Sequence, residues 1–184
     1  MQAIQLDYRA LLLTHWYQLL KITLESTDGN LPWVAALKTA LDDWDGQASA
    51  NSVAYRTVRT YRYEVMETVL NGFAAQVRQQ DATFKLPRLS QAEWIVWQLL
   101  ERQPHHLLQL PYKNWEELLN RSAQNIAAQL QRNGGITERN WGEYNAARIR
   151  HPLSQKLPAW IAQWLDMPND PLPGDHNMPR VHSP

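Results

Sequence analysis

Apolar residues recur every three or four positions along most of this chain, and this spacing places side chains on one face of an α-helix. The longest periodic segment runs from Ser52 to Gln80, and its apolar positions are Val58, Tyr61, Val65, Val69, Phe73 and Val77. The pattern predicts a mainly α fold, a bundle-like arrangement of five or six helices. Helices with clear bounds are predicted at residues 2–25, 31–44, 52–80, 90–102 and 114–132.

Local signals support several of these bounds. Pro32 suits a first helical turn, Ser90 and Glu93 have the spacing of a capping box, and Asn114 precedes two acids that favour the positive end of a helix dipole. Glycine-containing turns at residues 27–30, 45–46 and 133–135 end the helices before them. The first helix, which is apolar over much of its circumference, is expected to lie centrally in the bundle.

The character of the sequence changes after Gly135, because proline becomes frequent and the helical period weakens beyond Leu165. We therefore predict a helical domain at residues 1–166 and an extended, proline-rich tail at residues 167–184. The sequence has no alternating pattern typical of a β-hairpin and no internal repeat, which argues against a solenoid.

Composition narrows the classes of partner. Lysine plus arginine and aspartate plus glutamate number 18 each, so the formal net charge is zero and no nucleic-acid partner is predicted. No apolar run has the length of a membrane span, so no membrane partner is predicted. The absence of cysteine excludes disulfides and a thiol nucleophile. Nine tryptophans favour core packing, with an exposed aromatic docking face as the alternative.

The sequence contains histidine and acidic clusters, and none of them is predicted to bind a metal. His105 and His106 are adjacent and so project differently from a helix, which makes them a poor bidentate pair. Asp175, His176 and His182 lie in the predicted tail without the spacing of a known site. A further acidic cluster, at a predicted helix end where negative charge is unfavourable, consists of Asp42, Asp43 and Asp45.

A stripe of arginines marks the long predicted helix. Arg56, Arg59 and Arg62 stand three residues apart, a spacing that could contact phosphate or an acidic partner. Because Glu64 and Glu67 follow closely, the prediction is a solvated or intramolecularly salt-bridged face.

The serines offer no recognisable nucleophile. Serine occurs at positions 26, 49, 52, 90, 122, 154 and 183. None of them lies in a Gly-x-Ser-x-Gly elbow or a Ser-x-x-Lys arrangement, and no phosphate-binding glycine loop is present. No catalytic, cofactor-binding or metal-binding residue is therefore predicted in this chain.

Three ordered sets of residues carry a resemblance to a known family. They are residues 4–11 (IQLDYRAL); residues 41–46 (LDDWDG) with Ala48 and residues 52–55 (SVAY); and residues 141–145 (WGEYN) with 151–154 (HPLS) and 171–175 (PLPGD). In this order and at these intervals, they resemble the helical region of the β-chain of the penicillin acylase family, N-terminal-nucleophile hydrolases that split amide bonds.

The resemblance implies a periplasmic or secreted precursor that cleaves itself, so that a serine begins the β-chain and its own α-amino group acts as base. The family's catalytic residues and calcium ligands precede the segment that residues 4–11 resemble. The resemblance therefore implies an inactive fragment without a cofactor of its own. Its partners would be the remainder of the acylase α- and β-chains, and the isolated fragment is expected to self-associate.

The substrate and the role of the chain each have an alternative. Residues 176–181 read HNMPRV where many relatives have Thr-Val-Asn, which suggests a separate subgroup and leaves the acyl substrate unassigned. The alternative to an acylase fragment is a free-standing helical module that binds a protein partner through exposed tryptophans and the arginine stripe.

Overall fold

The computed structural model describes residues 2–87, 89, 91–108, 111–132, 134–147 and 149–180. This part of the chain is mainly α, as predicted, with one small antiparallel sheet formed by β1 (Ala146–Ala147) and β2 (Asp170–Pro171). Its α-helices are α1 (Gln2–Gln5), α2 (Thr14–Ser26), α3 (Pro32–Ala40), α4 (Val53–Gln80), α5 (Ala92–Arg102), α6 (Trp115–Gln131), α7 (Trp141–Tyr144) and α8 (Ala159–Leu165). Short 3₁₀ turns lie at Leu11–Leu13, His105–Leu107, Ile136–Glu138 and Ser154–Lys156.

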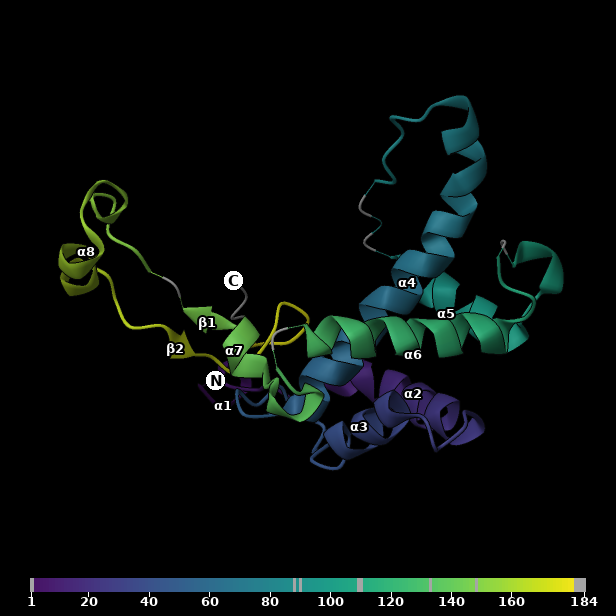
Figure 1. Cartoon of the computed structure of the whole chain (residues 1–184), viewed down its shortest axis with the longest axis horizontal. Helices are drawn as coiled ribbons and strands as arrows, with labels where there is room; N and C mark the ends of the chain where they lie inside the picture. The colour runs from purple at the N-terminus through teal and green to yellow at the C-terminus, as the bar shows by residue number, and fades with distance from the viewer. Residues whose placement is uncertain are drawn as a thin grey trace.

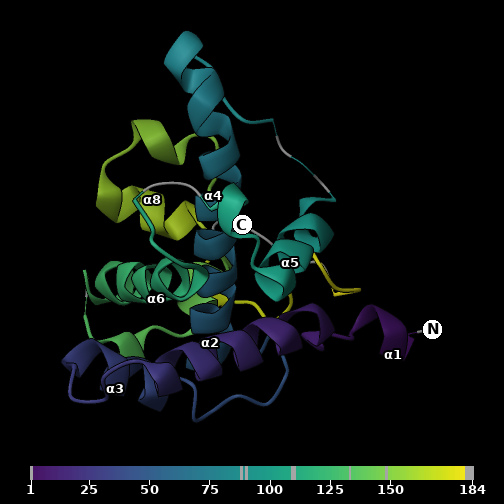
Figure 2. The ribbon, with the colours of Figure 1, turned by 90° about the vertical axis from the view of Figure 1, so that its right-hand side faces the viewer.

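Helix α4 is the centre of the bundle. It packs against α2 and α6, which also contact each other, while α3 closes the lower face and α5 lies beside α4 (Figures 1 and 2). Figures 1 and 2 show α4 crossing α2 and α6 steeply, so that its C-terminal half projects beyond them. Of the apolar positions predicted on α4, Val58, Tyr61, Val65 and Val69 are buried in the core, whereas Phe73 and Val77, in the projecting half of the helix, are exposed. The core also contains Leu20, Leu24, Val34, Leu37 and Ile126 from the other helices.

Most tryptophans pack in the core, as predicted, and the others are exposed. Trp16, Trp115 and Trp141 are buried in the core, and Trp33, Trp44 and Trp97 pack partly buried against it. Trp94, Trp160 and Trp164 are exposed. Core packing therefore accounts for six of the nine indoles, and three remain on the surface.

Two side chains cap the N-terminus of α4. The Ser52 hydroxyl accepts a hydrogen bond from the Tyr55 amide at 3.0 Å, and the Asp43 carboxylate accepts from the Val53 and Ala54 amides at 3.1 and 2.9 Å. Free amides at a helix start favour negative charge. The interpretation of Asp43 as an acid at an unfavourable helix end was therefore wrong, because α3 ends before it and Asp43 serves the next helix.

The prediction of one continuous helix over residues 2–25 was also wrong. Between α1 and the 3₁₀ turn at Leu11–Leu13, the chain leaves the helix and pairs with residues 46–48. The Ala10 amide donates to the Gly46 carbonyl at 2.7 Å, and the Ala48 amide donates to the Tyr8 carbonyl at 2.9 Å. These long-range bonds satisfy backbone groups that a helix would otherwise satisfy locally.

The start of α5 differs from the predicted capping box. Ser90 lies outside the described residues, and the helix begins after Gln91, whose side chain makes no capping hydrogen bond. The Glu93 carboxylate accepts hydrogen bonds from the Trp16 indole at 2.7 Å and from Arg62 at 2.6 and 2.8 Å. Glu93 thereby ties α5 to α2 and α4.

The C-terminal region leaves the bundle and returns to it. Strands β1 and β2 pair antiparallel, and the chain between them carries α8 away from the other helices (Figure 1). Residues 172–180 then lie against the bundle, where the Gly174 amide donates to the Ala48 carbonyl at 2.8 Å. Within the described range, residues 167–180 of the predicted tail contain β2 and turns without a helix. The pairing of β1 with β2 was not predicted, because each strand has only two residues.

Across the described ranges, no helix combines the length and the apolar character that crossing a lipid bilayer requires.

Replacing Ser52 with alanine removes the hydroxyl cap of α4 and leaves the Tyr55 amide without its acceptor. We expect the free energy of unfolding to fall by about 1 kcal/mol, the usual cost of losing such a cap. Urea unfolding followed by circular dichroism measures this. Ser26→Ala is the matched control, because the exposed Ser26 hydroxyl only donates to the Thr23 carbonyl at the end of α2. An equal loss in both variants would contradict the capping role.

Candidate functional site

The residues that carry the family resemblance meet at one place in the fold. The backbone links residues 7–10, 46–55, 141–145 and 171–180, a region that we call the junction. The Trp141 amide donates to the Ser52 carbonyl at 3.0 Å, and the Gly142 amide donates to the Ala50 carbonyl at 2.6 Å. The Arg180 amide donates to the Asp7 carbonyl at 3.0 Å. Residues 151–154 lie outside the junction, where the His151 amide donates to Asp166 at the end of α8.

The carboxylate of Asp175 is the buried centre of the junction. Asp175 is only 1% exposed. It forms an ion pair with the Arg59 guanidinium, accepts a hydrogen bond from the Tyr55 hydroxyl at 2.9 Å, and accepts another from the His176 amide at 2.7 Å. A buried charge is tolerated when it is paired and hydrogen-bonded in this way.

These contacts set the protonation states of the cluster. Burial alone would raise the pKa of Asp175, but the hydrogen bonds and charge of Arg59, helped by the His176 amide and the Tyr55 hydroxyl, lower it below its ordinary value. Burial and the Asp175 charge raise the pKa of Tyr55. Asp175 is therefore ionised and Tyr55 is a neutral hydrogen-bond donor at neutral pH.

Aromatic rings surround the Arg59 guanidinium. Its central carbon lies 4.6 Å from the ring centroid of Trp141, 4.7 Å from that of Tyr63 and 5.4 Å from that of Tyr144. Such stacking favours a desolvated guanidinium. The Trp141 indole also donates to the Gly174 carbonyl at 2.9 Å. The aromatic rings thus hold the Arg59 guanidinium, and the Trp141 indole also holds the residue that precedes Asp175.

Two glycines allow the chain segments of the junction to approach closely. A Cβ atom on Gly142 would lie 2.5 Å from the Pro171 Cβ and 3.0 Å from the Ala50 carbonyl oxygen. Gly174 has φ of +94°, and a Cβ there would lie 2.3 Å from the Arg180 carbonyl oxygen. Glycine in WGEYN and in PLPGD is therefore a packing requirement.

The arginine stripe is held by ion pairs within the chain, as predicted, although the partners are not Glu64 and Glu67. Arg56 pairs with Glu143 at 2.8 Å, Arg59 with Asp175, and Arg62 with Glu93 at 2.6 Å. Arg139 also pairs with Glu143. A cavity of about 440 Å³ beside the stripe is lined by Arg56, Arg59, Thr60, Tyr63, Glu64, Glu67, Gln129, Leu130, Arg132, Arg139, Trp141 and Tyr144. The stripe residues on its wall are thus engaged in holding the fold.

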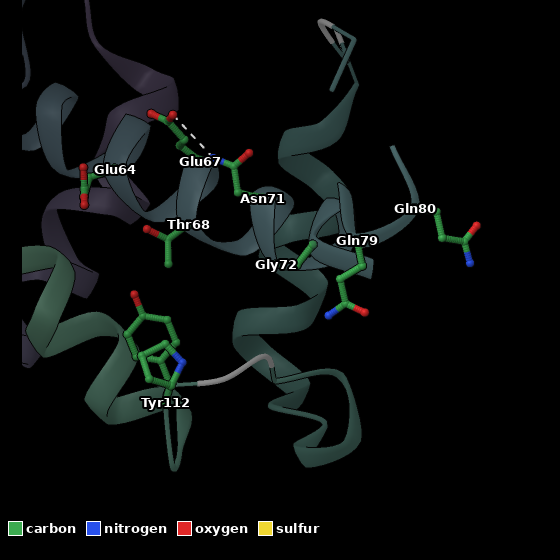
Figure 3. Close-up of a pocket in the computed structure, with 10 residues that line it drawn as sticks. Glu64, Glu67, Thr68, Asn71, Gly72, Gln79, Gln80 and Tyr112 are labelled. Atoms are coloured by element: carbon green, nitrogen blue, oxygen red, sulfur yellow. Dashed lines mark hydrogen bonds between the residues drawn. The ribbon is translucent and has the colours of Figure 1, made fainter. Parts of the chain in front are cut away.

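A larger cavity, of about 940 Å³, lies between α4 and the segment before α6 (Figure 3). Figure 3 shows Tyr112 across from the α4 side chains, among which the Asn71 amide donates to Glu67 at 3.4 Å. Its described lining is mainly polar and contains no histidine, lysine or serine. Glu64 is engaged by the Asn125 amide at 2.8 Å. The wall offers polar contacts and no paired nucleophile and base.

The histidines considered from the sequence lie apart. His105 and His106 stand in an exposed 3₁₀ turn. The His176 ring lies 2.6 Å from Asp175 and 3.2 Å from the Tyr63 hydroxyl, while His182 lies outside the described residues. No three His, Asp or Glu side chains come together as a metal site in the ranges that the structure describes.

Three of the described serines, Ser26, Ser52 and Ser154, form side-chain hydrogen bonds, whereas the buried Ser122 hydroxyl has no hydrogen-bond partner among the described residues. Ser52 caps α4, and the Ser154 hydroxyl binds Asp166 near α8. Ser122 is buried in α6, and Ser90 and Ser183 lie outside the described residues. Among the hydrogen bonds of the described residues, none joins a serine hydroxyl to a histidine, which is the contact that activates a serine in a Ser-His pair.

Sequence reasoning missed the cluster of Tyr55, Arg59 and Asp175. Arg59 was noted in the stripe and Asp175 in the PLPGD stretch, but the two are 116 positions apart. The only signal was the presence of a polar residue in each of two resembling stretches, Tyr55 in SVAY and Asp175 in PLPGD.

Comparison with known proteins identifies relatives of the chain. The family model described as Penicillin amidase matches residues 1–184. The chain is also 31% identical over 164 residues to the Penicillin acylase 2 proenzyme of Pseudomonas sp. (strain SE83), an alignment that covers 85% of this chain and 20% of that protein. The chain thus matches about a fifth of the length of this relative.

Asp175→Asn should remove the ion pair and leave Arg59 without its partner, at a cost of about 3 kcal/mol in unfolding free energy. Because folding lowers the pKa of Asp175, its contribution is present above the unfolded pKa of about 4 and is lost as the pH falls through the folded pKa. The variant should therefore lose less stability than the wild type between pH 7 and pH 3. Urea unfolding at both pH values measures this, with the exposed Asp42→Asn as control. A variant with the acid sensitivity of the wild type would contradict the assignment.

Gly142→Ala should force Pro171 and the Ala50 backbone apart. We expect the unfolding free energy to fall by about 1–3 kcal/mol, as for overpacked positions. Thermal unfolding checks this against Gly29→Ala, because a Cβ on Gly29 meets no atom within 4 Å. Stability equal to that of the wild type would contradict the close approach at the junction.

Proposed function

The chain belongs to the penicillin amidase family, and from this premise we propose that it is the helical segment of the β-chain of an amide hydrolase. The chain matches about a fifth of the length of its relative. We propose that the remaining parts of the α- and β-chains are its partners and that they carry the reacting groups.

The junction is the observation that supports this role. Its resembling residues bind one another through their polar groups, Tyr55 with Asp175 and Trp141 with Gly174, and Arg59 of α4 pairs with the same Asp175. Groups committed in this way hold four distant segments in a fixed arrangement. Such a rigid unit suits the support of a catalytic centre, because reacting groups must be held within fractions of an ångström.

In the proposed enzyme, the first residue of the β-chain is a serine outside this segment. Its hydroxyl attacks the acyl carbonyl while its own α-amino group takes the proton, and an acyl-enzyme forms as the amine leaves. Backbone and asparagine donors stabilise the oxyanion, and water then releases the acid. The helical segment contributes no nucleophile, metal or cofactor to these steps. By the family resemblance, we propose a periplasmic or secreted location.

A free-standing interaction module is the second candidate, and the three exposed tryptophans favour it. Exposed aromatic side chains anchor many protein interfaces. The reading frame around the coding DNA separates the two candidates. Upstream coding sequence for a catalytic sheet supports the acylase segment, and a start codon with a ribosome-binding site at Met1 supports the module.

We expect the 184-residue chain by itself to hydrolyse no chromogenic N-acyl nitroanilide, and the longer acylase that contains it to do so after self-cleavage. Replacing the first serine of that β-chain with alanine should abolish the reaction, because the nucleophile is lost. Initial rates with a panel of acyl groups provide the measurement. Activity of the short chain alone would contradict the proposal.

The scaffold role predicts a second outcome in the same acylase. Asp175→Asn should lower its thermal stability, while the molecules that remain folded, in which the other contacts of the junction keep the segments in place, retain the rate per titrated active site, since the contacts of Asp175 lie within the junction and on Arg59 of α4. Active-site titration separates the amount of folded enzyme from its turnover. A lower turnover per site with unchanged stability would show that the junction takes part in the chemistry.

A further inference from the structure

Residues 149–169, which we call the arm, project from the bundle and carry an unusually apolar surface. Within it, Trp160 and Trp164 are 67% and 82% exposed. Other exposed large apolar side chains of the arm are Ile149, Leu153, Leu165 and Met167. Helix α8 buries no residue, and Figure 1 shows it well apart from α2 to α6. Full solvation of so much apolar surface is unfavourable, so the arm has the character of an interface.

The arm has a defined internal structure. The Asp166 carboxylate accepts a hydrogen bond from the His151 amide at 2.9 Å and another from the Ser154 hydroxyl. The Met167 amide donates to the Ile149 carbonyl at 3.1 Å, and this hydrogen bond joins the two ends of the arm. These bonds organise the arm before any partner binds, and this lowers the entropy lost on docking.

The base of the arm is fixed to the junction. Strands β1 and β2 lie at its two ends, and the Asn145 side chain donates to the Leu172 carbonyl at 2.9 Å and to the Gly174 carbonyl at 3.1 Å. Asp175 follows directly and is anchored on α4. The direction in which the arm projects is therefore set by the same residues that hold the bundle together.

The surface of the arm indicates the chemistry of its partner. Trp160 and Trp164 are four residues apart, so both indoles stand on one face of α8. The charged side chains of the arm are Arg150, Lys156 and Asp166, which gives no strong field for nucleic acid or anionic lipid. Indole anchors on a nearly neutral surface fit an apolar protein surface with pockets for aromatic rings.

Such a surface is expected on the part of the acylase that lies outside this chain. The family match includes the arm, because it extends over residues 1–184. About four fifths of the acylase relative lies beyond the part that aligns with this chain. We propose that the arm docks through Trp160 and Trp164 into an apolar surface on the catalytic part of the acylase, an inference that rests on the proposed function.

Hydroxyl-radical footprinting of the 184-residue chain alone and of the acylase that contains it tests the proposal. In the chain alone, Trp160 and Trp164 should be oxidised rapidly. In the acylase, their oxidation should fall to the slow level of Trp16 and Trp141, which are buried within the bundle in both samples. Arm tryptophans that stay as reactive in the acylase as in the chain alone overturn the proposal.

A variant measures how much the docking depends on an indole. Trp164→Ala in the acylase should speed hydrogen exchange of the α8 amides about thirty-fold, the effect of removing one interface hot spot. Trp94→Ala is the matched control, because Trp94 is 70% exposed but lies on α5 within the bundle. An equal effect of both substitutions on α8 overturns the proposal.

The remaining outcomes separate this inference from the proposed function. Amide hydrolysis by an acylase whose arm tryptophans stay reactive overturns the docking alone, whereas protected tryptophans in a protein without amide hydrolysis overturn the proposed function alone. Protection in the chain alone that grows with its concentration, together with reactive arm tryptophans in the acylase, assigns the arm to a second copy of the chain. Protection of the chain alone by phosphatidylcholine and phosphatidylglycerol vesicles assigns it to a lipid surface. Either result overturns docking on the catalytic part.

Discussion

The buried carboxylate of Asp175 is the group on which the C-terminal third of this structure depends. A charge with 1% exposure is compatible with folding only because Arg59, Tyr55 and the His176 amide all bind it. Arg59 belongs to the central helix of the bundle, whereas Asp175 belongs to a loop with little regular structure. Their pairing gives that loop a fixed position. Strand β2, the turn at Gly174 and the arm are therefore positioned as well, because they adjoin the loop along the chain.

The same device recurs along α4. Arginines three residues apart on an α-helix differ by about 60° in direction, so Arg56, Arg59 and Arg62 face different parts of the fold. They bind acids from three separate segments: Glu143 in α7, Asp175 in the returning chain and Glu93 in α5. Burial alone would raise the pKa of Glu93, but Arg62 and the Trp16 indole lower it. The central helix therefore organises its neighbours by charge as well as by apolar packing.

This organisation is relevant to the role that we propose for the chain as a segment of an acylase. Buried ion pairs and close glycine contacts hold the segments of this scaffold in fixed relative positions. Because the polar side chains are already bound to one another, few of them are available to act on a substrate. The arm is the exception, because it is fixed at its base by β1 and β2 while its large apolar side chains are exposed. The junction thus provides internal rigidity, and the arm provides an exposed apolar surface. Both properties suit the role that we propose for this segment.

The sequence by itself determined the helices from α2 to α6, because their apolar period and their caps, such as Ser52 and Asn114, act between residues close along the chain. It also indicated the family, through short stretches in a fixed order. The break between α1 and α2, the capping role of Asp43, the partners of the arginines and the exposure of the arm were decided only by the tertiary structure. Their contacts join residues such as Arg62 and Glu93, 31 positions apart, or Arg59 and Asp175, 116 apart. No local pattern specifies which acid an arginine will meet across such a distance, since that depends on how the whole chain packs.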